Sequence, residues 1–161
     1  MKKLMMIAAM MLMSMGAFAQ EAGKLAVGVT FSDYLASDSR ILIGAKGQYS
    51  ITDNFRAEVD FKFAPKKDHV TWVNPTLNLQ YLIPIFDKFY AYPLVGVGLM
   101  SVASDSFDTQ SMVCFKGGAG CEYYITEQIK GLFEAYYQFA KKDGIKYSDR
   151  PLISIGAAYC F

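Results

Sequence analysis

After its first fifteen residues, the sequence has no apolar run close to the roughly 20 residues that a membrane-spanning helix needs. No segment keeps a sustained helical period of apolar residues. Histidine occurs once, and the spacing of the three cysteines matches no metal-binding pattern. We therefore predict no helical span after residue 15, no metal centre and no cofactor.

The three cysteines, Cys114, Cys121 and Cys160, are an odd number, so at least one of them has no disulfide partner within the chain. We interpret all three as small apolar fillers. A disulfide between Cys121 and Cys160 is the alternative.

The N-terminal segment has the three parts of a secretory signal peptide. A basic start and an apolar stretch precede the small residues Ala17 and Ala19, which a signal peptidase requires at the −3 and −1 positions. We predict cleavage before Gln20, which makes residues 1–19 the signal peptide and residues 20–161 the mature domain. No cysteine directly follows this cut, so the acyl anchor of a bacterial lipoprotein is not expected.

The charges of the mature chain nearly cancel. Cleavage removes two lysines, which leaves 14 of the 16 basic residues against 15 acidic ones, a net charge of about −1. This balance argues against nucleic acid as a partner, because nucleic-acid-binding proteins carry a basic surface. The 142 residues that remain after removal of 19 from 161 suit a single domain.

Alternation of apolar and polar residues recurs along the whole mature chain. In the clearest segment, Phe55 to Phe63, every odd position is apolar and every even position is charged. Since alternate side chains of a strand point to opposite faces, this segment predicts a strand with one apolar face and one ionic face. The same pattern predicts eight strands, at residues 24–32, 41–50, 55–63, 73–81, 89–100, 112–124, 129–139 and 153–161.

The links between these strands alternate in length. Three short links, at 51–54, 82–88 and 125–128, alternate with four polar and mostly longer ones, at 33–40, 64–69, 101–111 and 140–151. Outer-membrane barrels have short periplasmic turns and longer outer loops. The pattern therefore predicts an all-β fold, an eight-stranded antiparallel up-and-down transmembrane barrel with both termini in the periplasm. The segment 51–56 also resembles 125–130, which indicates two similar hairpin starts.

A soluble barrel also alternates, but it turns its apolar face inward. Here the charged face is narrow and nearly neutral, and five glycines on it, Gly44, Gly96, Gly98, Gly118 and Gly120, would make room for long side chains. The interior of an eight-stranded barrel is just wide enough for its side chains. We therefore predict a lumen filled by ion pairs among Lys46, Arg56, Glu58, Asp60, Lys62, Lys116, Glu122, Lys130 and Glu134.

Aromatic residues lie near the predicted strand ends, where outer-membrane barrels have girdles at both bilayer interfaces. The predicted girdle residues are Phe31, Tyr49, Phe63, Tyr81, Phe89, Tyr90, Tyr92, Tyr123, Tyr124 and Phe139. The last predicted strand carries its larger residues on one face and closes with an aromatic one. This face comprises Ile153, Ile155, Ala157, Tyr159 and Phe161.

Strand number, alternating links and this C-terminal strand together resemble the small eight-stranded outer-membrane barrel family, which includes the transmembrane part of outer-membrane protein A (OmpA) and the OmpX-type barrels. Residues 78–84, 89–93 and 96–98 also resemble the outer membrane protein beta-barrel domain, often labelled porin-like. The resemblance covers the mature chain and implies the outer membrane of a Gram-negative bacterium. In this family the C-terminal strand is the signature read by the barrel-assembly machinery.

We expect a non-enzymatic barrel that contributes to outer-membrane structure or surface interaction. Its expected partners are outer-membrane lipid and, during biogenesis, the assembly machinery, while a surface ligand of the longer loops stays open. The alternatives are a small porin-like channel and a lipid A-modifying enzyme. The enzyme would need His69, which we interpret as a solvent-exposed loop residue. The carboxylates Glu58, Asp60 and Glu134 are interpreted as ion-pair partners, so no catalytic residue is predicted.

Overall fold

The computed structural model describes residues 22–34, 41–67, 70–104, 107–142 and 145–161. The predicted cleavage residues Ala17, Ala19 and Gln20 lie outside this part of the chain, as does His69. The strands are β1 (Leu25–Tyr34), β2 (Ile41–Ser50), β3 (Phe55–Lys67), β4 (Val70–Tyr81), β5 (Ile83–Phe86), β6 (Phe89–Ser104), β7 (Phe107–Tyr124), β8 (Ile129–Lys142) and β9 (Ile145–Cys160).

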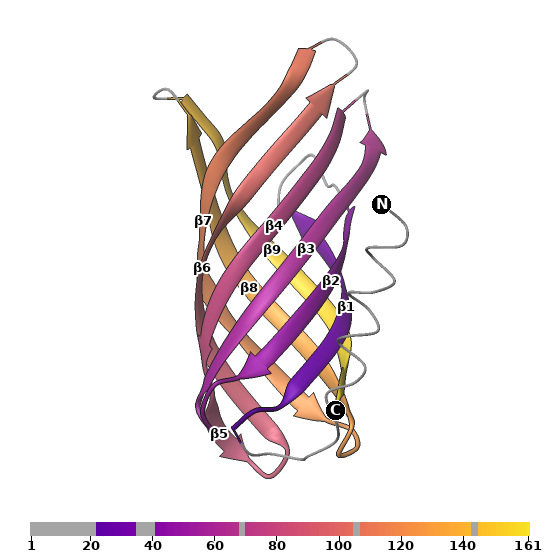
Figure 1. Ribbon diagram of the computed structural model, residues 1–161, viewed down its shortest axis with the longest axis vertical. Coiled ribbons are helices and arrows are strands. Elements are labelled where there is room, and N and C mark those ends of the chain that lie inside the picture. The colour runs from indigo at the N-terminus through magenta and orange to yellow at the C-terminus, as the bar shows by residue number, and fades with distance from the viewer. Residues whose placement is uncertain (1–21, 35–40, 68–69, 105–106, 143–144) are drawn as a thin grey trace.

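These strands form one closed antiparallel barrel (Figure 1). The hydrogen-bonded order is β4-β3-β2-β1-β9-β8-β7-β6, and pairing of β4 with β6 closes the ring. The short β5 continues the course of β4 beyond Leu82 and pairs only with β6 among the described strands. The wall therefore has eight strands in up-and-down order, which confirms the predicted fold.

At one end of the barrel the strands are longer than predicted. Strand β3 continues to Lys67, β6 to Ser104 and β8 to Lys142, and their partners pair with them there. The predicted loops at 64–69, 101–111 and 140–151 are therefore mostly strand, and the wall extends at the upper end in Figure 1. Strands β3, β4, β6 and β7 remain paired with one another there, and β8 and β9 form a separate two-stranded ribbon. Alternation of apolar and polar residues marks only the part of a strand with one apolar face, whereas backbone pairing continues without any side-chain pattern.

The opposite end of the barrel carries the short turns, and two of them have the same hydrogen bonds. The N–H groups of Ile51 and Thr52 donate to the carbonyl of Phe55, and those of Ile125 and Thr126 donate to that of Ile129. In each turn the threonine hydroxyl oxygen accepts from the backbone N–H groups two and three residues later. The similar hairpin starts seen in the sequence are therefore one turn used twice.

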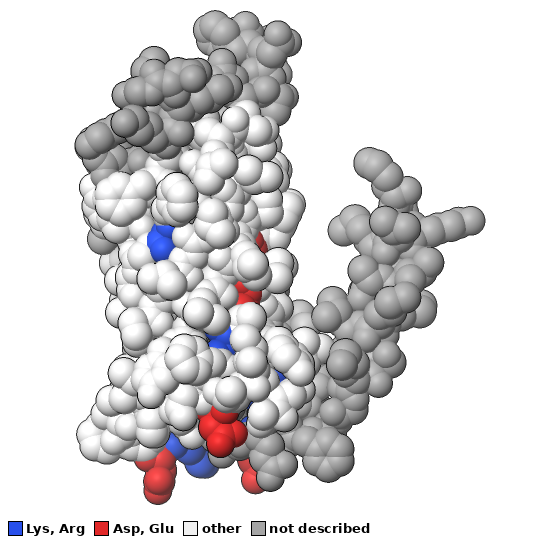
Figure 2. Space-filling model, turned by 60° about the vertical axis from the view of Figure 1, so that its left-hand side comes forward, with Lys and Arg blue, Asp and Glu red and all other residues white. Residues whose placement is uncertain are grey.

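The outer surface of the wall is apolar. Along β3 the odd positions face outward, and Val59 and Phe61 are 59% and 49% exposed. Figure 2 shows a wall almost free of charged atoms, with acidic and basic groups gathered at the lower end. From Ile41 to Ile51 the chain advances ten steps of about 3.3 Å, and a tilt of about 40° makes the apolar band about 25 Å tall, the height that a lipid bilayer requires. No helix in the described ranges is long and apolar enough to span a membrane.

Candidate functional site: the ion-paired interior

The charged face of the strands lines the inside of the barrel. All nine residues of the predicted lumen set lie there, and none is more than 4% exposed. They come from β2, β3, β7 and β8, which alternate their side chains between lipid and lumen as the sequence pattern requires. Their ion pairs fall into three groups along the barrel axis.

The first group lies nearest the short turns and centres on Glu122. The Arg56 guanidinium lies 2.8 Å from this carboxylate, and the Lys130 ammonium lies 3.1 Å from it. Arg56 also donates from Nε to the side-chain oxygen of Gln80 at 2.6 Å. Two cations therefore share one carboxylate at this end of the lumen.

The second group centres on Lys46, which bridges two carboxylates from different strands. Its ammonium lies 3.1 Å from Glu58 and 2.8 Å from Glu134. Glu58 also accepts hydrogen bonds from three amide side chains, and Glu134 accepts one from the hydroxyl of Tyr92. The three amide donors are Gln48, Asn78 and Gln80. They belong to the same inward-facing pattern, but the predicted set contained charged residues alone and omitted them.

The third group joins Asp60 to Lys62 and Lys116. Both ammonium groups also lie over the ring of Tyr136, at 4.9 Å and 4.0 Å from its centre. The negative face of an aromatic ring attracts cations, so Tyr136 supplements the charge of the shared carboxylate.

Beyond this third group, toward the extended end of the wall, the lumen is apolar. Tyr34, Leu42 and Leu152 are buried there, and the ring of Tyr34 packs edge-on against that of Trp72, with their centroids 5.7 Å apart. A neighbouring cluster contains Met100, Met112, Cys114 and Ala140. The alternating pattern does not predict this apolar section, because it assigns apolar side chains to the lipid-facing side. The alternation of side chains along a strand could have indicated this section, because Leu42 and Lys46 are both even-numbered residues of β2 and therefore share its inner face.

The predicted aromatic girdle is wrong for Tyr92. Phe31, Tyr81 and Phe139 face outward as expected, but Tyr92 is 1% exposed and points into the lumen. Its place follows from parity, because Tyr92 shares the inner face of β6 with Gly96 and Gly98. The partly buried Tyr90 and Tyr124 lie on this inner side too and line the mouth of the barrel.

The cysteines do not form the alternative disulfide, and all three are free. Cys114 is buried in the lumen. Cys160 shares the inner face of β9 with the buried Ala158, whereas Cys121 lies on the outer face of β7, between the inward-facing Gly120 and Glu122. Side chains on opposite faces of the wall cannot bridge.

Gly118 makes space for a neighbouring strand. A Cβ atom built on it would lie 2.3 Å from the carbonyl oxygen of Ala135 and 2.5 Å from the Cα atom of Tyr136. Both distances are shorter than van der Waals contact, so the Cβ atom would clash with β8. The adjacent Gly117 faces outward, and a Cβ atom there meets nothing within 4 Å.

We expect Gly118→Ala to lower the free energy of unfolding by about 1–3 kcal/mol, since overpacking forces backbone and side chains to shift. Gly117→Ala is the matched control and should leave stability unchanged or slightly higher. Urea unfolding of both variants in detergent micelles, followed by tryptophan fluorescence, measures the difference. Equal stability of the two variants would contradict the assigned faces of β7.

The C-terminal signature residues lie on the lipid side of the closing strand. Ile155 and Tyr159 on β9 are 55% and 43% exposed. Phe161 follows the strand, donates its backbone N–H to the carbonyl of Leu25 at 2.8 Å and packs edge-on against Tyr159. These residues therefore lie at the β1–β9 seam, where the barrel closes.

Among the described residues of the interior, every buried carboxylate is paired with a base, and the five bases exceed the four carboxylates by one. Each of these four carboxylates is within 3.2 Å of at least one basic nitrogen. Within the part of the chain that the structure describes, no group of three histidine, cysteine or acidic side chains is placed to hold a metal ion.

Comparison with known protein families settles the kind of barrel. Residues 5–161 match the family described as "Outer membrane protein beta-barrel domain". The chain belongs to this family. Membership in the outer membrane protein beta-barrel domain family identifies the apolar belt as the lipid-facing surface of an outer-membrane barrel. None of the curated proteins matches the chain in sequence.

Several solved outer-membrane barrels share the fold. The N-terminal β-barrel domain of Pseudomonas aeruginosa OprF matches with a TM-score of 0.73 and 20% identity, over 88% of this chain and all of that one. Neisserial surface protein A matches with a TM-score of 0.65 and 12% identity, over 85% and 94% of the two chains. OprG from Pseudomonas aeruginosa matches with a TM-score of 0.63 and 16% identity, over 89% and 98%. At these identities the likeness concerns the fold alone.

Proposed function

We propose that the chain is a non-enzymatic integral barrel, plugged by its own side chains, that contributes to outer-membrane structure or surface interaction. The observation that carries this proposal is the interior network. Its nine buried charged residues occupy the section of the lumen that lies between the levels of Arg56 and Lys62 along the barrel axis. An ion that crosses this section must displace buried ion pairs, and breaking such a pair costs about 3–5 kcal/mol. The section around Tyr34 and Leu42 adds a second obstacle, because it is lined mainly by apolar side chains, which do not replace the water that surrounds an ion.

Planar-bilayer recording tests the plugged lumen. We expect the purified barrel to give no stable conductance steps, because buried ion pairs occupy the lumen. Samples should first show different migration on SDS gels with and without boiling, which reports a folded barrel. Stable ion-sized steps from such samples would contradict the plug and favour the small porin-like channel.

Export and location are tested on the same protein. We propose that cleavage after Ala19 leaves Gln20 as the first residue, that the assembly machinery reads the strand ending in Phe161, and that the barrel then resides in lipid. Fractionation with the outer membrane and an intact mass beginning at Gln20 would support this. A change in lipid A that depends on His69 would instead favour the lipid A-modifying enzyme.

A further inference from the structure

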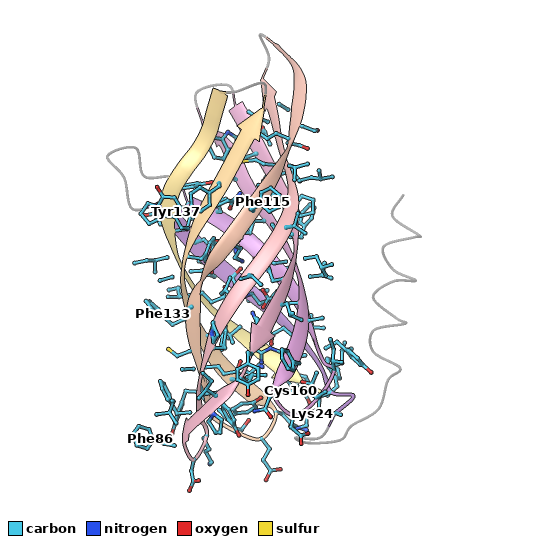
Figure 3. All side chains as sticks on the ribbon, turned by 90° about the vertical axis from the view of Figure 1, so that its left-hand side faces the viewer. Lys24, Phe86, Phe115, Phe133, Tyr137 and Cys160 are labelled. Atoms are coloured by element: carbon cyan, nitrogen blue, oxygen red, sulfur yellow. The ribbon has the colours of Figure 1, made fainter. Side chains whose placement is uncertain are left out.

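A cavity of about 320 Å³ opens at the short-turn end of the barrel. Its wall includes Lys24 before β1, Ser50 and Thr52 around the β2–β3 turn, and Tyr90 and Tyr124 on β6 and β7. Figure 3 labels Lys24 at this lower end of the barrel. The volume lies at the lower limit of small-molecule pockets, which run from about 300 Å³ upward.

The inner boundary of this cavity carries an excess of positive charge. Arg56 and Glu122 both line it, and Lys130 lies directly behind Glu122. Both oxygens of the Glu122 carboxylate already accept hydrogen bonds, Oε1 from Arg56 and Oε2 from Lys130. Lys24 adds a further positive charge on the wall. Asp53 also lines the cavity and carries a negative charge, but it lies in an exposed turn, where solvent screens this charge.

Hydrogen-bond donors are available at the same place. The guanidinium of Arg56 is 2% exposed and is fixed through Nε by Gln80 and through Nη1 by Glu122, while its Nη2 has no partner among the described residues. The hydroxyl oxygen of Thr52 accepts two backbone N–H groups, and among the described residues its own O–H has no recorded acceptor. A planar guanidinium with a spare N–H suits the oxygens of a carboxylate or a phosphate.

Beside these donors the cavity has an aromatic and apolar wall. The rings of Tyr90 and Tyr124 pack edge-on with their centroids 5.7 Å apart, and Leu82 and Pro84 complete this side. Such a wall favours a ligand that carries a ring or a short alkyl body next to its charge.

We propose that this cavity binds a small organic anion, whose carboxylate or phosphate meets Arg56 and Lys24 and whose apolar part packs against Tyr90 and Tyr124. The anion comes either from a free small molecule or from a phospholipid headgroup. The site goes beyond the plugged-barrel function, because the Arg56–Glu122 pair closes its inner side and the ligand does not traverse the lumen.

Titration of the folded barrel in uncharged detergent micelles tests the site. The probes are benzoate, inorganic phosphate and dihexanoyl-phosphatidylglycerol, and binding is followed by backbone amide NMR shifts of the β2–β3 turn and β7. We expect saturable binding of benzoate or of the lipid, weakened about threefold to tenfold by Lys24→Gln through loss of one partly screened charge. Arg56→Gln should weaken binding at least about tenfold, through loss of a charge-assisted hydrogen bond.

Lys88→Gln is the matched control, because Lys88 lies at the same end of the barrel but outside the cavity lining. It should leave affinity unchanged. If Arg56→Gln does not fold, the affinities of Lys24→Gln and Lys88→Gln for the probes are compared instead. Binding of benzoate supports a free anion, and binding of the lipid without benzoate supports a headgroup. Absence of saturable binding by every probe, or equal weakening by Lys24→Gln and Lys88→Gln, overturns the proposal, whatever the conductance recordings show.

Discussion

Replacement of Lys46 by methionine is expected to lower the free energy of unfolding by about 3–5 kcal/mol, the loss typical of a buried ion pair deprived of one partner. Lys46 is 2% exposed and bridges Glu58 on β3 and Glu134 on β8. Without it, two carboxylates would lie in a medium of low dielectric without the cation that they share. Urea unfolding in detergent micelles, with the single tryptophan as reporter, measures the loss.

The double variant Lys46→Met/Glu134→Gln distinguishes lost charge balance from lost packing. It keeps the net charge of the lumen and leaves Glu58 with its three amide donors. We expect it to recover at least about half of the stability lost in Lys46→Met. A loss in the single variant below about 1 kcal/mol, the size found for exposed pairs, would contradict a buried network.

Val59→Arg should cost about 2–4 kcal/mol, because it places a charge on the lipid face near the middle of the apolar band. Val59 is 59% exposed and lies halfway along the alternating segment of β3. In a water-soluble barrel an exposed valine would tolerate arginine with a change within about 0.5 kcal/mol. The variant therefore tests whether the outer face of the barrel is in contact with lipid or with water.

Phe55→Arg is the control for depth. Phe55 shares the outer face of β3 but lies at its first residue, beside the β2–β3 turn, where arginine can reach the headgroup region. The cost there should fall to about 0–1 kcal/mol. Measurement of both variants by unfolding in phospholipid bilayers gives the comparison, and equal costs at the two positions would contradict the membrane orientation of β3.

The sequence was most informative where one strand face is uniform. From Phe55 to Phe63, charged and apolar residues alternate without exception, and both faces are as predicted. It was less informative where the lumen itself is apolar. The residue types of Leu42 and Trp72 do not distinguish an apolar lumen from lipid. Their inward position follows only from the alternation of side chains along β2 and β4, in which even-numbered residues face the lumen. The strand extensions beyond Ala64 were missed for a related reason, since polar residues can occupy either a loop or a strand surrounded by water.

By itself, the sequence determined the eight strands of the wall, the places of the turns at 51–54 and 125–128, and the face on which each of the nine lumen charges lies, whereas the link predicted at 82–88 is mostly the strand β5. These are local properties, because two successive residues of a strand always point to opposite sides. The tertiary structure decided which charges meet. Lys46 and Glu134 are 88 residues apart, and Arg56 and Glu122 are 66 apart, so their contacts depend on how the strands tilt and close around the lumen. Closure also brought the inward-facing Tyr92 within hydrogen-bond distance of Glu134 and formed the cavity around Arg56 and Lys24 at the mouth of the barrel.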